Sequence, residues 1–70
     1  MASAKLHTST YKIHNSSDWI TVNWNHVEFI TYFKIDGEKV GTSIHFNSGN
    51  QLNVKDDLIR VERDMKFGKS

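Results

Sequence analysis

The chain has 70 residues, nine Lys and Arg against eight Asp and Glu, and no Cys or Pro. A domain of this size buries only about 60% of its unfolded surface, and the lack of Cys excludes disulfides and Cys-based zinc sites as extra stabilisation. The net charge of +1 gives no strong field for nucleic acid or membranes, and no apolar run approaches the ~20 residues of a membrane span. We expect a cytoplasmic protein without cofactors and without membrane contact.

The N-terminal segment is polar. Residues 1–10 predict a flexible arm and lack the apolar core of a signal peptide. One folded domain is expected over residues 11–67. Its first two strands are predicted at 11–14 and 19–22, because the intervening Asn, Ser and Asp residues form turns.

The apolar pattern changes phase after the second strand. Inward-facing residues are even-numbered up to Val22 and odd-numbered from Val27. A shift of one residue requires a bulge or a short turn, and Asn23 and Asn25 tolerate the left-handed conformation. We predict a tight turn or a one-turn helix at residues 23–26.

The strongest local signal is Asp36-Gly37 between two alternating apolar runs. Such a dipeptide favours a type I′ hairpin turn, which needs positive φ at both residues. An uninterrupted hairpin then predicts the cross-strand pairs Ile35–Glu38, Phe33–Val40, Thr31–Thr42, Phe29–Ile44 and Val27–Phe46. In that register Ile30 and Tyr32 point away from the core.

A fifth strand and a helix complete the chain. A three-residue loop at 48–50 would place Leu52 opposite Phe46 and Val54 opposite Ile44. Beyond Lys55 the apolar residues recur about every 3.6 positions. Acidic residues precede this segment and basic residues end it, as the helix dipole favours.

These elements predict a mainly β fold. We expect a small, curled, barrel-like antiparallel β-meander of four to five strands with one short C-terminal α-helix. The predicted core consists of Ile13, Ile20, Val22, Val27, Phe29, Phe33, Val40, Ile44, Phe46, Leu52, Val54, Leu58, Val61 and Met65.

Four short stretches carry a family resemblance. Residues 20–23, 26–30, 44–49 and 52–55 follow the order apolar-Val-Asn, apolar strand, apolar strand with a polar-Gly turn, and Val-Lys before a helix. This pattern resembles the small FlbD-type proteins of bacterial flagellar operons. The same middle portion is similar to the last strands of LytTR-type DNA-binding domains. The resemblance implies a β-meander with a C-terminal helix and assigns no functional residue.

The outward apolar residues are the first candidate site. Ile30 and Tyr32 point outward in the predicted register, and Trp24 and Trp19 could extend their surface. Exposed apolar patches usually mark interaction sites, although the helix or the arm could instead cover this one. We expect a non-catalytic interaction or regulatory module that self-associates. The sequence style also suits a phage or bacterial accessory protein that binds a larger protein machine.

Nucleic-acid binding is the alternative function. Small β-domains stack bases on aromatic residues beside Lys and Arg. The basic candidates for such a site are Lys12, Lys34, Arg60, Arg63 and Lys66. Dipole complementarity explains the helical members of this set equally well.

Metal binding and catalysis find less support. His26, Glu28 and His45 would be neighbours in the predicted register and could ligate zinc, but a solvated polar face is the simpler interpretation. The chain has neither a Cys nucleophile nor a glycine-rich phosphate loop. We therefore expect no metal and no enzymatic activity.

Overall fold

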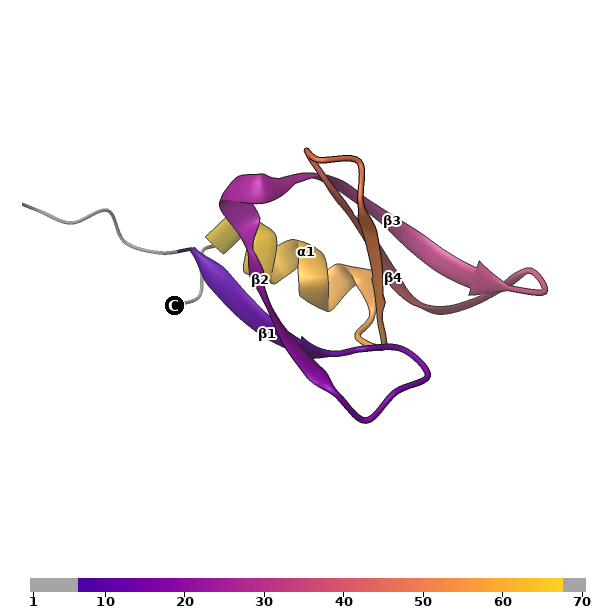
Figure 1. The fold of residues 1–70 in the computed structure, drawn as a ribbon. Coiled ribbons are helices and arrows are strands. Elements are labelled where there is room, and N and C mark those ends of the chain that lie inside the picture. The colour runs from indigo at the N-terminus through magenta and orange to yellow at the C-terminus, as the bar shows by residue number, and fades with distance from the viewer. Residues whose placement is uncertain (1–6, 68–70) are drawn as a thin grey trace, which may run out of the picture.

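The computed structural model describes residues 7–67. Five strands, one 3-10 helix and one α-helix follow one another in the order β1 (Thr8–Lys12), β2 (Trp19–Asn23), η1 (Trp24–His26), β3 (Val27–Ile35), β4 (Glu38–Phe46), β5 (Gln51–Val54) and α1 (Leu58–Phe67). All strand pairs are antiparallel. The mainly β fold with a C-terminal helix is as predicted (Figure 1).

The strands form two small sheets rather than one closed sheet. β1 pairs with β2, and β3, β4 and β5 form a three-stranded sheet in that order. The two sheets meet at a single bridge, Ile13–Val54, where the His14 N–H donates to the Asn53 carbonyl at 2.9 Å and the Lys55 N–H donates to the Lys12 carbonyl at 3.0 Å. The expected barrel-like closure is therefore wrong, because pairing between the sheets extends no further than this bridge.

A second contact joins the sheets at their other end. The Asn47 N–H, in the β4–β5 turn, donates to the His26 carbonyl in η1 at 2.8 Å. The one-turn helix predicted at 23–26 is confirmed, with the Asn23 side chain accepting a hydrogen bond from the Asn25 N–H at 3.0 Å. β1 begins at Thr8, so residues 8–10, expected in the arm, belong to the sheet; residues 1–6 lie outside the described part.

The turns follow the predicted chemistry. Asp36 and Gly37 have φ values of 52° and 83°, as a type I′ turn requires. The β4–β5 loop is one residue earlier than predicted, because Gly49 takes the left-handed conformation with φ 95° and the Phe46 N–H donates to the Asn50 carbonyl. As a result Leu52 lies opposite Ile44 instead of the predicted Phe46. The register of β5 is shifted by two residues, so the same side chains of β5 still face inward.

Two register shifts change the middle of the β3–β4 hairpin. The end pairs Val27–Phe46 and Ile35–Glu38 are as predicted, but between them Ile30 lies opposite Ile44. One shift lies between Phe33 and Lys34, where Val40 is the extra residue of β4, and the other lies beside Glu28. Because a bulge inserts one residue into one strand, the segment 29–33 is turned over. The charged residues Glu28 and Lys34 lie just outside this segment, so turning it over does not bury them.

The core differs from the prediction accordingly. Its buried members are Tyr11, Val22, Trp24, Ile44, Val54 and Val61, with Ile20, Val27, Ile30, Phe46, Leu52 and Met65 packed against them. Tyr11, Trp24 and Ile30 were not predicted to be inside. Phe29 was expected in the core but is 47% exposed. The other predicted members, Ile13, Phe33, Val40 and Leu58, are half-buried.

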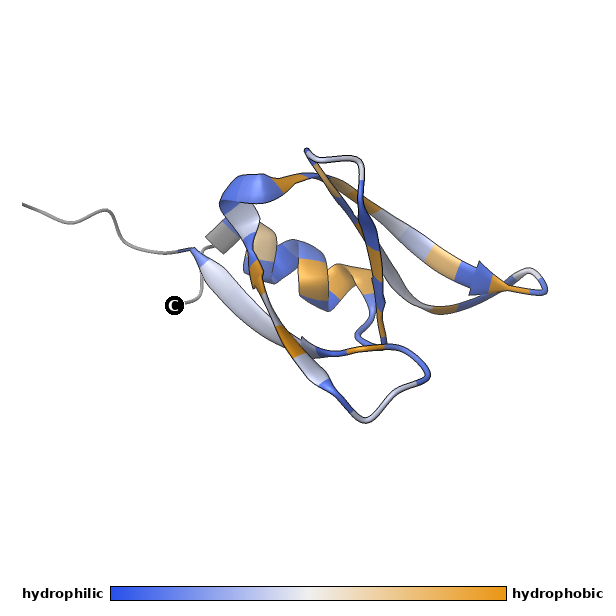
Figure 2. Cartoon of the chain, viewed as in Figure 1, coloured by the Kyte–Doolittle hydropathy of each residue, from blue (hydrophilic) through white to orange (hydrophobic). Residues whose placement is uncertain are grey.

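Helix α1 lies between the two hairpins (Figure 1). Apolar residues are found both on this helix and on the strands around it (Figure 2). Its start is fixed by two aspartates: the Ile59 N–H donates to the Asp57 carboxylate at 3.2 Å, and the buried Thr42 hydroxyl donates to the Asp56 carbonyl at 2.8 Å. The helix is thereby tied to the inner side of β4.

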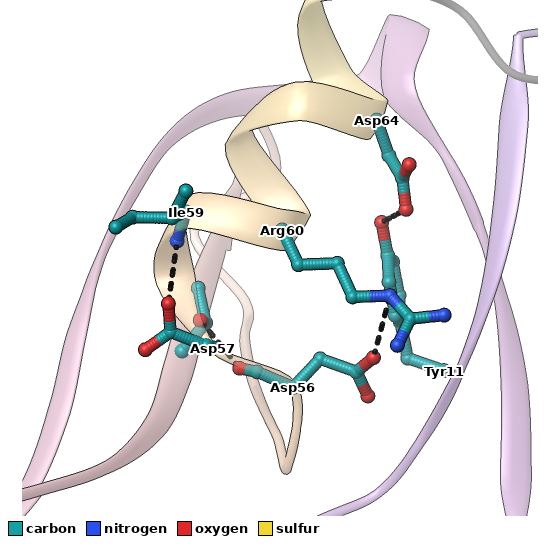
Figure 3. A network of polar contacts seen from close by, with 7 residues as sticks. Tyr11, Asp56, Asp57, Ile59, Arg60 and Asp64 are labelled. Carbon is teal, nitrogen blue, oxygen red and sulfur yellow. Dashed lines mark hydrogen bonds and ion pairs between the residues drawn. The ribbon is translucent and has the colours of Figure 1, made fainter.

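The middle of α1 is fastened to the first sheet. The Tyr11 hydroxyl donates to the Asp64 carboxylate at 2.6 Å (Figure 3). Burial raises the pKa of Tyr11, and the hydrogen bond to Asp64 raises it further. Tyr11 therefore stays neutral and remains a donor over the whole ordinary pH range.

Candidate interaction surface

The three-stranded sheet has an outer face on the side opposite Ile44. Directly paired residues share a face, so the register places four rows there. One row is Phe29, His45 and Gln51, the next is Thr31, Ser43 and Asn53, the third begins with Phe33 and Gly41, and the pair Ile35–Glu38 follows near the hairpin tip. The bridge to β1 brings His14 and Lys12 beside Asn53 and Lys55 at the margin of this face.

A polar network occupies the centre of the outer face. The Ser43 hydroxyl donates to the Asn53 side-chain carbonyl at 2.7 Å. The Gln51 amide donates to both, at 3.3 Å to Ser43 and 3.2 Å to Asn53. Because these groups satisfy one another, their side chains are held in fixed positions.

An aromatic residue lies on each side of this network. The rings of Phe29 and His45 stack with centroids 4.3 Å apart and planes 14° apart. The His45 Nε2 also lies 3.0 Å from the Thr31 hydroxyl. On the other side His14 meets Phe33 edge-on, with centroids 4.9 Å apart. The face therefore combines aromatic rings with oriented amide and hydroxyl groups.

Close packing of the backbone explains the position of Gly41. A Cβ atom on Gly41 would overlap the carbonyl oxygen of Val54. Only glycine allows β4 and β5 to approach this closely. This contact holds the third row of the outer face in register.

The free edge of the sheet is β3. In residues 7–67, β3 pairs with β4 on one side, and no described strand pairs with its other side. Its nine residues include the exposed Phe29, Tyr32 and Ile35. An edge strand presents unpaired backbone groups to a second chain, and the β3–β4 hairpin projects away from the helix (Figure 1).

The predicted partner-binding residues do not form one surface. Trp24 is 6% exposed, and its indole N–H donates to the Ser9 hydroxyl at 2.8 Å, so it belongs to the core. Ile30 packs against the core, because the bulges turn it inward. Tyr32 is exposed beneath the Lys39 ammonium, 4.2 Å from its ring centroid, and Trp19 is 66% exposed on the other sheet.

The predicted nucleic-acid residues are also dispersed. Arg60 pairs at 3.5 Å with Asp56, just before the helix, and Lys66 pairs at 3.7 Å with Glu62 within the helix. Arg63 is exposed on the same helix. Lys34 lies near the hairpin tip, paired with Lys39, and only Lys12 borders the outer face.

The predicted metal set is not assembled. Phe29, rather than Glu28, lies opposite His45. Within residues 7–67 no group of three or more His, Asp or Glu side chains is close enough to hold a metal ion. The same register shift that built the stack of Phe29 on His45 separates these ligands.

Sequence reasoning missed most of the outer face. Phe29 and Phe33 were assigned to the core, and the network of Gln51 and Asn53 was not foreseen. An available signal was Gly41, since an isolated glycine inside a strand indicates a bulge or a close backbone approach. A bulge next to Gly41 would have turned both phenylalanines outward.

A groove of about 380 Å³ opens between the two sheets beside η1. Its lining is mostly amide, hydroxyl and apolar groups, from Thr21, Val22, Asn23, His26, Phe46, Asn47, Ser48 and Asn50. His26 is the titratable side chain among them.

No helix in residues 7–67 is both long and apolar enough to cross a membrane. Comparison of the chain with protein-family models, with curated proteins and with solved structures finds no significant match.

Proposed function

We propose that this protein is a non-catalytic interaction module that joins polypeptide chains and associates with itself through its three-stranded sheet. The observation that carries the proposal is the nine-residue edge strand β3, with aromatic residues exposed along it. A long exposed edge of this kind pairs readily with another strand.

The size of the core supports self-association. Six apolar side chains are buried within residues 7–67. Small domains without disulfides or metals commonly gain stability by oligomerisation. In this proposal the module works in the cytoplasm, as a phage or bacterial accessory protein that attaches to a larger assembly.

The solution mass tests the proposal. Light scattering after size exclusion should give a multiple of the 8.1 kDa chain mass at micromolar concentration. Phe29→Asp should reduce that mass, because it places a charge on the exposed part of β3. The matched control is Trp19→Asp, at an even more exposed aromatic residue of the other sheet. A monomer at every concentration would refute self-association.

A second candidate function is binding of single-stranded nucleic acid on the outer face. The specific observation in its favour is the excess of basic groups on that face: its register rows and margin include Lys12, Lys55, His14 and His45, against the single acid Glu38 near the hairpin tip. Aromatic rings beside basic groups are the usual platform for bases.

Fluorescence anisotropy with a labelled oligo(dT) tests this second candidate. Affinity should fall steeply with salt, because phosphate contacts release counterions. Lys55→Glu should weaken binding, whereas Lys66→Glu on the helix should not. Equal loss in both variants, or no binding at low salt, would dismiss the outer face as a nucleic-acid site.

A further inference from the structure

The sequence of β3 is complementary to itself. We infer that two copies of the chain pair antiparallel through β3, about a two-fold axis at Thr31; this deepens the proposed self-association by naming the partner and the register. The pairs across the interface are then Glu28–Lys34, Phe29–Phe33, Ile30–Tyr32 and Thr31–Thr31.

Each pair in this register is chemically favourable. Glu28 meets Lys34 of the second copy, and the symmetry forms this pair of opposite charges twice. Phe29 meets Phe33 on the outer face, where aromatic cross-strand pairs are favoured. On the inner face Ile30 meets Tyr32, so apolar groups again lie opposite each other.

The neighbouring registers are worse. If the outer faces of the two copies stay on one side, the strands can slide only by steps that keep each face. One step puts Glu28 opposite Asp36 and Ile30 opposite Lys34. The opposite step puts Glu28 opposite Tyr32 and Lys34 opposite His26. The charges therefore select the register centred on Thr31.

The exposure of β3 fits a second copy of the same strand. Phe29 and Tyr32 are exposed in the single chain. In the dimer the second copy would cover both residues of each chain. The bulge at Glu28 breaks the regular ladder at one end, and bulges limit how far an edge can pair. Pairing over residues 28–34 would join the two outer faces into one six-stranded surface.

Charge reversal tests the register. Glu28→Lys and Lys34→Glu should each raise the dimer dissociation constant by roughly tenfold, because like charges then face each other twice. The double variant Glu28→Lys/Lys34→Glu should restore dimerisation. Glu38→Lys, exposed on β4, and Lys55→Glu, exposed just after β5, are matched controls that should leave the dissociation constant unchanged.

A cysteine reporter provides an independent measurement. The chain contains no Cys, so Thr31→Cys is a single reporter at the axis and should form a disulfide-linked dimer on mild oxidation. Thr21→Cys, at an exposed threonine on β2, is the control and should crosslink slowly. This interface is refuted if charge reversal leaves the dimer dissociation constant unchanged and Thr31→Cys crosslinks no faster than the control. Self-association itself would then still hold. A monomer refutes both.

Discussion

Phe29 and His45 lie face to face on the outer face, with ring centroids 4.3 Å apart. Opposite pairing of these two residues depends on the extra residue Glu28 in β3 and the extra residue Val40 in β4, which shift the central segment by one position. The stack of Phe29 on His45 is therefore a direct consequence of the two bulges. Its counterpart on the inner side is the pair Ile30–Ile44.

Alanine substitutions at adjacent positions of β3 should differ in their effect on stability. Ile30→Ala should lower the free energy of unfolding by ~2 kcal/mol, because it opens a cavity against Ile44. Phe29→Ala should cost less than ~1 kcal/mol, since much of that ring stays in water. Urea unfolding at low protein concentration, where association does not contribute, makes the measurement. If Phe29→Ala cost more stability than Ile30→Ala, the uninterrupted hairpin register would be the correct one.

A methyl group at Gly41 should be poorly tolerated. Gly41→Ala places a Cβ onto the Val54 carbonyl oxygen, so β4 and β5 must move apart, at a cost of ~2 kcal/mol or more. Thermal and urea unfolding would measure the loss. Ser17→Ala, in the exposed β1–β2 turn, is the control and should change stability by less than ~0.5 kcal/mol. Equal stability of the two variants would contradict the close approach.

Tyr11→Phe should change both stability and its pH dependence. Loss of the hydrogen bond to Asp64 should cost ~1.5 kcal/mol at neutral pH. The folded pKa of Tyr11 is raised, so its stabilising contribution is complete below the unfolded pKa of about 10 and is lost as the pH rises above it. The difference between wild type and Tyr11→Phe should therefore shrink at alkaline pH. Tyr32→Phe, at an exposed tyrosine, is the control; a constant difference would show that Tyr11 ionises freely.

The two tryptophans should differ in fluorescence. In Trp19→Phe the remaining Trp24, buried and bonded to Ser9, should emit at short wavelength and resist quenching by iodide. In Trp24→Phe the remaining Trp19 should emit at long wavelength and be quenched readily. Similar quenching of the two variants would place Trp24 on the surface after all.

Local signals predicted the elements of this fold well. Asp36-Gly37 set the hairpin turn, the phase change after Val22 marked η1, and the change of period beyond Lys55 marked the helix. Each depends on neighbouring residues and on backbone preferences that act within a few positions. The same reasoning placed Val27 opposite Phe46 and Ile35 opposite Glu38 correctly.

The candidate interaction surface was not predictable in the same way. Two bulges of opposite effect leave both ends of the hairpin in the expected register, so the alternating pattern alone does not disclose them. Whether Phe29 or Ile30 turns inward depends on how well each fits against the core beside Ile44, which is a tertiary property. The composition of the outer face therefore follows from packing rather than from periodicity.

The contact between Asn47 and His26 has a consequence for the dynamics of the molecule. Together with the bridge at Ile13, it fastens the two sheets at opposite ends, so neither sheet can open without breaking bonds to the other. The backbone amides of His14, Asn47 and Lys55 donate these bonds. They should exchange with solvent deuterium only through global unfolding, as one cooperative unit, even though they lie in connecting segments that ordinarily exchange fast.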